Sequence, residues 1–150
     1  MKGYLDDEQA NKEVFVNGWF NTGDLARIDK DGYIFLTGRK KNVIVLKNGK
    51  NIYPEEIEAL IDKIPYVVEN VVMGEEEGDD YRLVAHVVYD PEAEALKDKT
   101  AEEIQAIIDA DIEKINDEMP KYKRVKQTYI RTEEFEKTTT QKIKRRKVTK

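Results

Sequence analysis

The sequence feature that most limits the fold is the alternation of two kinds of apolar spacing after Val43. Short runs rich in valine, isoleucine and tyrosine are typical of strands, whereas two longer segments repeat their apolar residues every three or four positions, as amphipathic helices do. The predicted order is a hairpin, a helix, two strands, a second helix and a last strand. This order predicts a small α+β domain, in which a β-hairpin and a three-stranded, mainly antiparallel sheet are packed by helices.

The two helices are marked by their start signals as well as by their spacing. Pro54 suits the first turn of a helix, where its missing N–H costs nothing, and Pro65 is expected to end the same helix. Thr100 and Glu103 form a capping-box pattern ahead of the second helix. The apolar faces consist of Ile57, Leu60, Ile61 and Ile64 in the first helix and of Ile104, Ile107, Ile108, Ile112 and Ile115 in the second.

Two pairs of an Asx residue and glycine mark expected hairpin turns. Asp31-Gly32 ends the connection between two apolar runs, 25–28 and 33–36, and glycine adopts the positive φ of such turns at little cost. Asn48-Gly49 is the favoured pair for a two-residue turn, here within a hairpin that spans 43–53. The stretch between these hairpins, with its glycine and three cations at 37–41, interrupts the apolar pattern and suggests a boundary.

The remaining segments have weaker signals. Residues 1–21 show no sustained periodicity, so we expect turns with one short strand at Val14–Val16. Residues 66–73 and 81–89 are expected to pair as antiparallel strands on either side of an acidic, solvated loop at 74–80. Val125–Ile130 is expected to form the last strand of the sheet.

The charges are unevenly distributed along the chain. Lys and Arg number 26 and Asp and Glu 31, and this net charge of −5 argues against a general nucleic-acid binder. Residues 121–150 nevertheless contain 12 basic and 3 acidic side chains. Any anionic ligand is therefore expected near this basic tail, although residues 134–150 are too polar to form a stable element of their own.

Several classes of site are excluded by composition. The chain has no cysteine and a single histidine, His86, so it cannot form a disulfide, a thiolate nucleophile or a metal site with several histidines. The absence of cysteine fits a reducing compartment. No apolar run approaches the ~18 residues of a membrane-spanning helix. We therefore expect a soluble, cytoplasmic protein with at most peripheral membrane contact.

In four segments the identity of the residues, and not only the spacing of the apolar ones, is informative about function. In chain order they are Gly18-Trp19-Phe20-Asn21-Thr22-Gly23-Asp24-Leu25 with Asp31-Gly32-Tyr33, then Gly38-Arg39-Lys40-Lys41, then Lys47 to Glu58, and finally Phe135 to Arg145. Together they resemble the motifs of the adenylate-forming (AMP-binding) enzymes, a superfamily of acyl-CoA synthetases, luciferases and the adenylation domains of peptide synthetases. The resemblance spans Gly18 to Arg146, and residues 43–54 look most like those of long-chain fatty-acid–CoA ligases.

The resemblance implies two domains. Residues 1–38 would be the C-terminal end of a large N-terminal domain, and residues 39–150 would be the small mobile C-terminal domain of the family. The phosphate-binding loop and the acid pocket of the large domain are not in this sequence. We therefore expect a C-terminal fragment that is inactive alone and whose main partner is its own missing N-terminal domain.

The family reaction suggests roles for residues near the expected domain boundary. It joins a carboxylate to the α-phosphate of ATP, expels pyrophosphate and passes the acyl group to the thiol of CoA. ATP, CoA and Mg²⁺ are therefore implied, with the magnesium ligands outside this chain and no metal site within it. By resemblance Asp24 accepts hydrogen bonds from the ribose hydroxyls, Arg39 contacts the nucleotide, and Lys41 is the hinge about which the small domain rotates.

Two further segments are assigned to the two chemical steps. By resemblance the loop containing Gly49, Lys50 and Asn51 faces the pantetheine arm of CoA. Lys142 is the predicted catalytic residue, because a compact ammonium on a flexible stem can neutralise a carboxylate and an α-phosphate as they meet. Gln141 stands where many relatives have glycine, and this departure bears on the geometry of the lysine loop.

The resemblance thus predicts the C-terminal part of an ATP-dependent long-chain fatty acid–CoA ligase, an acid–thiol ligase whose substrates are a fatty acid, ATP and CoA. One alternative is an adenylation domain that loads an amino or aryl acid onto a carrier protein. Another is an independent module whose basic tail binds a polyanion such as RNA or an anionic membrane. The last alternative leaves the Thr-Gly-Asp and Gly-Arg motifs unexplained, so no nucleic-acid partner is expected.

Overall fold

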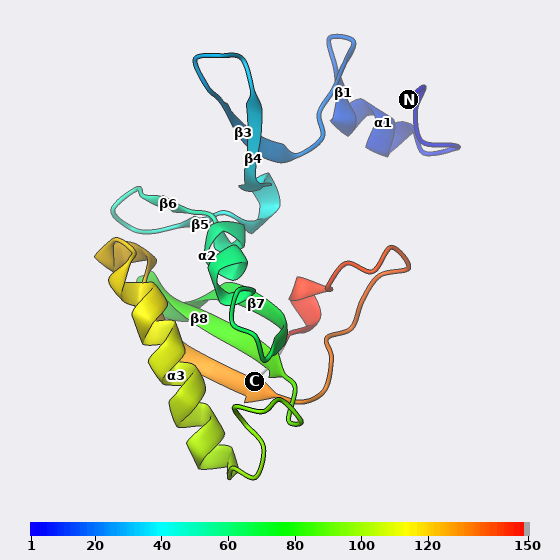
Figure 1. Cartoon of the computed structure of the whole chain (residues 1–150). Coiled ribbons are helices and arrows are strands. Elements are labelled where there is room, and N and C mark those ends of the chain that lie inside the picture. The colour runs from blue at the N-terminus through cyan, green and yellow to red at the C-terminus, as the bar shows by residue number, and fades with distance from the viewer. Residues whose placement is uncertain (149–150) are drawn as a thin grey trace. The chain divides into compact units, whose positions relative to one another are not determined.

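The computed structural model describes residues 1–148, which form two compact units that divide between Asn42 and Val43 (Figure 1). The division falls a few residues after the boundary at 38/39 that the resemblance predicts. The predicted small domain extends to Lys150, and its last two residues lie outside the described residues. No helix within residues 1–148 is long and apolar enough to cross a membrane.

The first unit consists of a short helix and two hairpins. Its elements are α1 (Glu8–Val14), β1 (Phe15–Val16), β2 (Trp19–Phe20), β3 (Asp24–Ile28) and β4 (Ile34–Arg39), and the strands pair antiparallel as β1–β2 and β3–β4. The prediction of turns alone before the first strand is wrong, because α1 is a helix. None of its residues is buried, so it lacks the apolar stripe by which a helix is recognised in sequence.

The predicted hairpin at 25–36 is confirmed. Gly32 has a φ of +87°, and the carboxylate of Asp29 accepts hydrogen bonds from the backbone N–H groups of Asp31 and Tyr33 at 2.9 Å. The second strand continues through the glycine-containing stretch that predicted an interruption. A bulge next to Leu25 accommodates this continuation, and β4 ends only at Arg39.

The second unit is built from a small hairpin, a three-stranded sheet and two helices. Its elements are β5 (Ile44–Val45), β6 (Asn51–Ile52), α2 (Pro54–Ile61), β7 (Val67–Glu77), β8 (Asp80–Tyr89), α3 (Ala101–Asp117) and β9 (Val125–Arg131), with short 3-10 turns at Lys121–Lys123 and Arg145–Lys147. A further 3-10 turn at Lys40–Asn42 ends the first unit. The sheet order is β7-β8-β9, with β7 antiparallel and β9 parallel to β8. Two parallel strands need a crossover connection, and α3 supplies it.

The predicted fold class is confirmed, and both helices begin where the sequence predicts. Thr100 and Glu103 form the complete capping box of α3. The predicted acidic loop at 74–80 is wrong for most of its length, because β7 runs to Glu77 and β8 begins at Asp80. Cross-strand pairing stabilises this acidic strand: Arg82 of β8 forms an ion pair with Glu75 at 2.9 Å.

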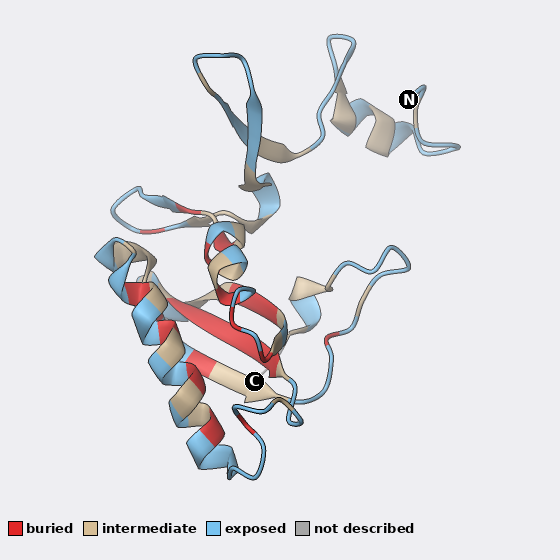
Figure 2. Ribbon diagram, in the orientation of Figure 1, coloured by how far each residue is buried: buried red, intermediate tan, exposed pale blue. Residues whose placement is uncertain are grey.

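The main core lies between one face of the sheet and the helices α2 and α3 (Figure 2). Its central side chains are Ile57 and Ile61 from α2, Ile104, Ile108 and Ile112 from α3, and Val72, Leu83, Ala85 and Val87 from the sheet. Each fully buried side chain of this size contributes about 1.5–3 kcal/mol to folding. The predicted apolar faces thus supply the helical side of the core, with one correction: α2 ends at Ile61, before the predicted stop at Pro65, so Ile64 packs into the core from the turn that follows the helix and Leu60 is not part of the core.

A smaller cluster lies on the opposite face of the sheet. Val71 and Val88 point away from the main core because successive strand residues alternate between faces, and the side chain of Phe135 buries them. Ile143 and Val148 pack against the same cluster. The described part of the basic tail that follows β9 thus covers this face of the sheet.

Candidate functional site

The two predicted nucleotide-binding residues lie side by side in the first unit. Asp24 begins β3 and Arg39 ends β4, and the strand register pairs them directly. The Nε of Arg39 lies 2.9 Å from Oδ1 of Asp24, and its Nη1 donates to the carbonyl oxygen of Thr22 at 3.0 Å. The side chains remain 48% and 29% exposed, so the pair is accessible to a ligand. Sequence motifs 15 residues apart are therefore joined by one hairpin.

Lys41 lies in the 3-10 turn that directly precedes the division between the two units. The turn is attached to the first unit, because the N–H of Lys40 donates to the carbonyl oxygen of Gly23 at 2.9 Å. The side chain of Lys41 is exposed. Its role as a hinge remains a prediction.

Gly49 lies in the turn of the β5–β6 hairpin and has a φ of +78°. The predicted two-residue turn is wrong: the N–H of Gly49 donates to the carbonyl oxygen of Leu46, and the N–H of Leu46 donates to that of Lys50, at 2.8 and 3.0 Å. The loop therefore has three residues and ends in a glycine with positive φ, a common hairpin geometry. Asn48 needs no positive φ in this turn, and its side chain accepts a hydrogen bond from the N–H of Lys50 at 3.0 Å.

Contacts on both sides hold the β5–β6 loop, and sequence reasoning missed them. The N–H of Lys47 donates to the carboxylate of Asp80 at 2.9 Å, and its ammonium forms an ion pair with Asp79. The ammonium of Lys50 lies 4.2 Å from the centroid of the Tyr122 ring, a cation–π contact. The acidic composition of 74–80 was the available signal for the first contact.

Lys142 lies near the tip of a second, C-terminal hairpin. Lys137 and Ile143 form an isolated antiparallel bridge, and the N–H of Thr138 donates to the carbonyl oxygen of Lys142 at 2.8 Å. The N–H of Lys142 donates back to the hydroxyl oxygen of Thr138 at 3.2 Å. The side chain of Lys142 is exposed, and within residues 1–148 its ammonium has no hydrogen-bond or ion-pair partner.

Other cations of the tail are paired with carboxylates. Lys144 and Lys147 both contact Glu136, at 3.3 and 2.7 Å. These contacts hold the pKa of the Glu136 carboxyl below its ordinary value. Lys137 pairs with Glu69 of β7 and Arg145 with Glu58 of α2. The uneven distribution of charge in the sequence was the only signal for these pairs.

Gln141 has a φ of +60°, a left-handed conformation that is uncommon outside glycine. The backbone at this position therefore has the geometry for which glycine is suited. Its N–H donates to the carbonyl oxygen of Thr138 at 2.9 Å, which closes the turn immediately before Lys142. The departure from the family pattern keeps the loop geometry at the cost of local strain.

We expect Gln141→Asn to strengthen this turn and Gln141→Val to weaken it, each by about 1 kcal/mol. Asparagine tolerates a left-handed conformation, whereas a β-branched side chain is strongly disfavoured there. Hydrogen exchange of the Thr138, Gln141 and Lys142 amides measures the effect locally. An unchanged exchange rate in both variants would contradict a strained turn.

The loop that contains Gly49 and the C-terminal hairpin that contains Lys142 lie on opposite sides of the second unit, with α2 between them (Figure 1). The structure therefore brings Asp24 and Arg39 together but separates Gly49 from Lys142. No group of three His, Asp or Glu side chains within residues 1–148 is arranged to hold a metal ion.

Comparison with known proteins gives a consistent result. Residues 41–150 match the model of the AMP-binding enzyme C-terminal domain. Over 74 residues the chain is 48% identical to the "Putative acyl--CoA ligase YdaB" of Bacillus subtilis, a match that covers 49% of this chain and 14% of that protein. Over 93 residues it is 41% identical to the "Long-chain-fatty-acid--CoA ligase FadD15" of Mycobacterium tuberculosis, with 62% and 15% covered. The chain thus spans a small part of these relatives.

A third relative and a solved structure extend the comparison. The chain is 46% identical over 74 residues to the "2-succinylbenzoate--CoA ligase" of Bacillus licheniformis, covering 49% of this chain and 15% of that one. The structure of O-succinylbenzoate Coenzyme A Synthetase (MenE) from Bacillus subtilis in complex with AMP superposes with a TM-score of 0.77 at 28% identity. It covers 100% of this chain, which corresponds to 28% of that protein.

Proposed function

The chain belongs to the AMP-binding enzyme C-terminal domain family, and from this premise we propose that it is the C-terminal portion of an ATP-dependent acid–thiol ligase. The observation that carries the proposal is the exposed ammonium of Lys142, which has no partner within residues 1–148, whereas the nearby Lys144 and Arg145 are paired with carboxylates. A positioned but unneutralised cation is what a reaction between two anions requires.

In the proposed first step, an oxygen of the acid's carboxylate forms a bond to the α-phosphorus of ATP. The bond from that phosphorus to the bridging oxygen breaks, and pyrophosphate leaves with the electron pair. The ammonium of Lys142 lies between the carboxylate and the α-phosphate and lowers their mutual repulsion. Asp24 accepts hydrogen bonds from the two ribose hydroxyls, and Arg39 holds the carboxylate of Asp24 in place while its remaining donors face the nucleotide.

In the proposed second step, the sulfur of CoA attacks the acyl carbon, the thiol proton is released and AMP leaves with the bonding electrons. The loop of Gly49, Lys50 and Asn51 lines the approach of the thiol, since glycine places no side chain there. This loop and the C-terminal hairpin that contains Lys142 lie on opposite sides of the second unit (Figure 1), so one orientation of the unit cannot present both to the same acyl group. We therefore assign Lys41, next to the division between the units, as the hinge for a change of orientation.

The exposed apolar side chains of the first unit support a missing partner domain. A set of large apolar residues in β2, β3, β4 and their turns is exposed, namely Trp19, Phe20, Ile28, Tyr33, Ile34, Phe35 and Leu36. So many exposed large apolar side chains are typical of a surface that contacts another part of a protein. The proposed cover is the large N-terminal domain of the same protein, of which residues 1–38 would be the end; residues 39–150 would be the mobile domain.

The acid that we propose is a long-chain fatty acid. Residues 43–54 resemble those of long-chain fatty-acid ligases, and one relative has that name. Other relatives are named as ligases of 2-succinylbenzoate and indoleacetate. The experiment therefore compares these acids with a long-chain fatty acid as substrates. The first assay measures acid-dependent exchange of pyrophosphate into ATP by the longer protein that contains this chain, with the three acids in parallel. The second assay measures thioester formation with CoA for each acid that supports exchange.

The proposal requires exchange with at least one acid and transfer to CoA. Exchange with an amino or aryl acid, followed by transfer to a carrier protein and not to CoA, would instead identify a carrier-loading enzyme. Absence of exchange with every acid, together with salt-sensitive binding to RNA or anionic vesicles, would overturn the proposal in favour of a polyanion-binding module.

Asp24→Asn in that longer protein is expected to raise the KM for ATP by about 10- to 100-fold. The amide keeps one acceptor oxygen but loses the charge, and a hydrogen bond to a charged group contributes about 1.5–3 kcal/mol. Asp31→Asn, on the turn of the same hairpin, is the matched control and should leave the KM unchanged. Equal effects of the two variants would contradict ribose binding by Asp24.

A further inference from the structure

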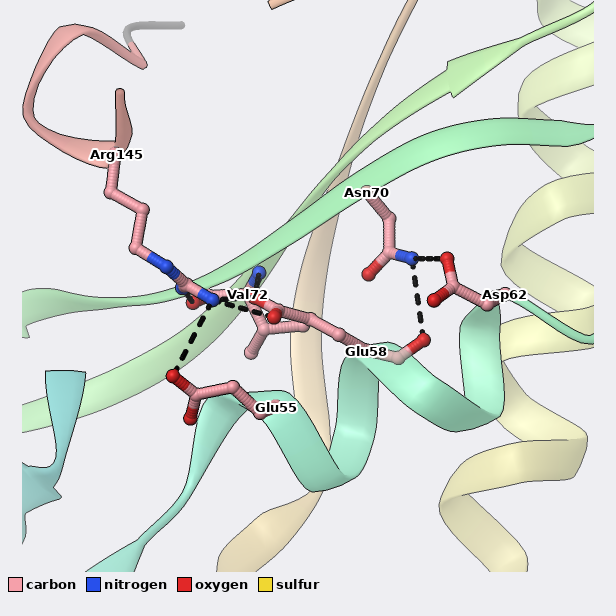
Figure 3. Close-up of polar contacts among 6 residues, drawn as sticks. All are labelled: Glu55, Glu58, Asp62, Asn70, Val72 and Arg145. Carbon is pink, nitrogen blue, oxygen red and sulfur yellow. Dashed lines mark hydrogen bonds and ion pairs between the residues drawn. The ribbon is translucent and has the colours of Figure 1, made fainter. Parts of the chain in front are cut away.

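An ion pair between Arg145 and Glu58 connects the C-terminal hairpin to the body of the second unit (Figure 3). The Nη2 of Arg145 lies 2.7 and 2.5 Å from the two carboxylate oxygens of Glu58. The side chains are only 24% and 13% exposed. Burial raises the pKa of the Glu58 carboxyl above its ordinary value, and the charge of Arg145 opposes this shift.

The same two side chains bind both main-chain groups of Val72. The carboxylate of Glu58 accepts the N–H of Val72 at 2.7 Å, and Nη1 of Arg145 donates to its carbonyl oxygen at 3.0 Å (Figure 3). Val72 lies in β7, which has β8 on one side and no strand on the other within residues 1–148. The two side chains thus take the place of the backbone groups that a further strand would offer to Val72. Arg145 is held both by the carboxylate of Glu58 and by the carbonyl oxygen of Val72.

Glu58 is itself held against β7. Its backbone carbonyl oxygen accepts a hydrogen bond from the side-chain N–H of Asn70 at 3.3 Å, and the same amide donates to Asp62 at 2.6 Å (Figure 3). Glu58 therefore belongs to a segment that Asn70 of β7 holds at two points, the carbonyl oxygen of Glu58 and the carboxylate of Asp62. A displacement of Arg145 would have to break contacts with both elements.

The other end of the C-terminal hairpin has an anchor of the same kind. The carboxylate of Glu69 in β7 pairs with the ammonium of Lys137 and accepts the N–H of Phe135 at 3.1 Å. Phe135 is buried against Val71 and Val88. Both ends of the hairpin are therefore fixed, and the segment with Lys142 projects between them.

We propose that Arg145 and Glu58 are positioning residues for Lys142, through their joint hold on the edge of β7. The inference rests on the proposed function, in which Lys142 acts in the adenylation step. Lys142 precedes Arg145 by three residues in an ordered segment, so the ion pair restricts where the backbone of Lys142 can lie. A small misplacement of a reacting group lowers a rate on the order of 10²-fold without weakening substrate binding.

The test uses Arg145→Lys and Glu58→Gln in the longer protein, with Lys147→Gln as the matched control. Lys147 lies in the same 3-10 turn, but its ion pair with Glu136 is largely exposed. We expect both test variants to lower the kcat of adenylation on the order of 10²-fold. The KM for ATP and the rate of thioester formation from supplied acyl-adenylate should stay unchanged. Arg145→Lys also changes the contacts with the carbonyl oxygen of Val72 and with Glu55, which lies 3.9 Å from Nη2. The double variant should nevertheless lose little more than Arg145→Lys alone, because Glu58 acts on Lys142 through Arg145.

Hydrogen exchange on the 150-residue chain provides a second readout. The amides of Thr138 and Lys144 donate within the C-terminal hairpin, and both should exchange faster in Arg145→Lys while amides of β8 stay protected. Adenylation that is sensitive to Lys142→Ala but unaffected by both test variants would overturn the inference and leave the proposed function intact. Adenylation that is insensitive to Lys142→Ala would reject the proposed role of Lys142 itself and the inference with it. A loss of β8 protection in both variants, or equal loss of both half-reactions, would show that the pair merely stabilises the fold.

Discussion

In the longer protein that contains this chain, Lys142→Ala should lower the rate of acyl-adenylate formation by at least about 10²-fold, while thioester formation from supplied acyl-adenylate continues. Removal of one preorganised group that stabilises developing charge costs rates of this size. The ammonium is exposed and has no partner within residues 1–148, so its loss breaks no contact of the fold. Exchange of pyrophosphate into ATP measures the first step, and a single turnover with supplied adenylate and CoA measures the second.

Lys126→Ala is the control for that experiment. Lys126 is an exposed lysine of β9 that also has no partner within residues 1–148, and its removal changes the net charge by the same amount. It should leave both half-reactions unchanged. If Lys142→Ala reduced the two half-reactions equally, or if the control reproduced its effect, the assignment of Lys142 to adenylation would be wrong.

Gly49→Leu should have the opposite effect: adenylation continues and thioester formation falls at least about 10-fold. A Cβ at this position would meet no atom within 4 Å, so the side chain projects into open space. The left-handed φ of +78° costs about 1–2 kcal/mol for a residue other than glycine. The unit should tolerate this cost, whereas the leucine side chain would obstruct the thiol in the proposed second step.

Gly78→Leu is the matched control for Gly49→Leu. Gly78 lies in the β7–β8 turn, has a φ of +65° and likewise has no atom within 4 Å of an added Cβ. Gly78→Leu should lower the stability of the fold by a similar amount but leave the rate of thioester formation unchanged. A similar loss of thioester formation in both variants, or a loss of adenylation in Gly49→Leu, would contradict the proposed CoA-facing role of the loop.

The sequence predicts the parts of the fold whose information is local. Helix α3 has its capping box and its isoleucine face within one continuous segment, and the structure has both. Helix α1 was missed because it buries nothing, and the strand character of Glu75 was missed because the residue that stabilises it, Arg82, lies on the neighbouring strand. Composition alone cannot identify such a partner.

The candidate site is predictable in its residues but not in its arrangement. The resemblance singles out Asp24, Arg39 and Lys142 by motif, and the pairing of the first two follows from one hairpin. The contact between Glu58 and Arg145 spans 87 positions, and no periodicity or propensity relates residues so far apart. The positive φ of Gln141 was likewise hidden, because the usual signal for it is a glycine.

The arrangement at Val72 has a consequence for synthesis of the protein. Arg145 follows Val72 by 73 positions, so the carbonyl oxygen that it binds leaves the ribosome well before its partner does. At about 5–20 residues per second, this delay lasts roughly 4–15 s. During that interval the nascent chain exposes Val71 and an open strand edge, a template for pairing with other chains. Premature termination before Arg145 would leave the carbonyl oxygen of Val72 without its side-chain donor, so this part of the strand edge would stay open to pairing with other chains.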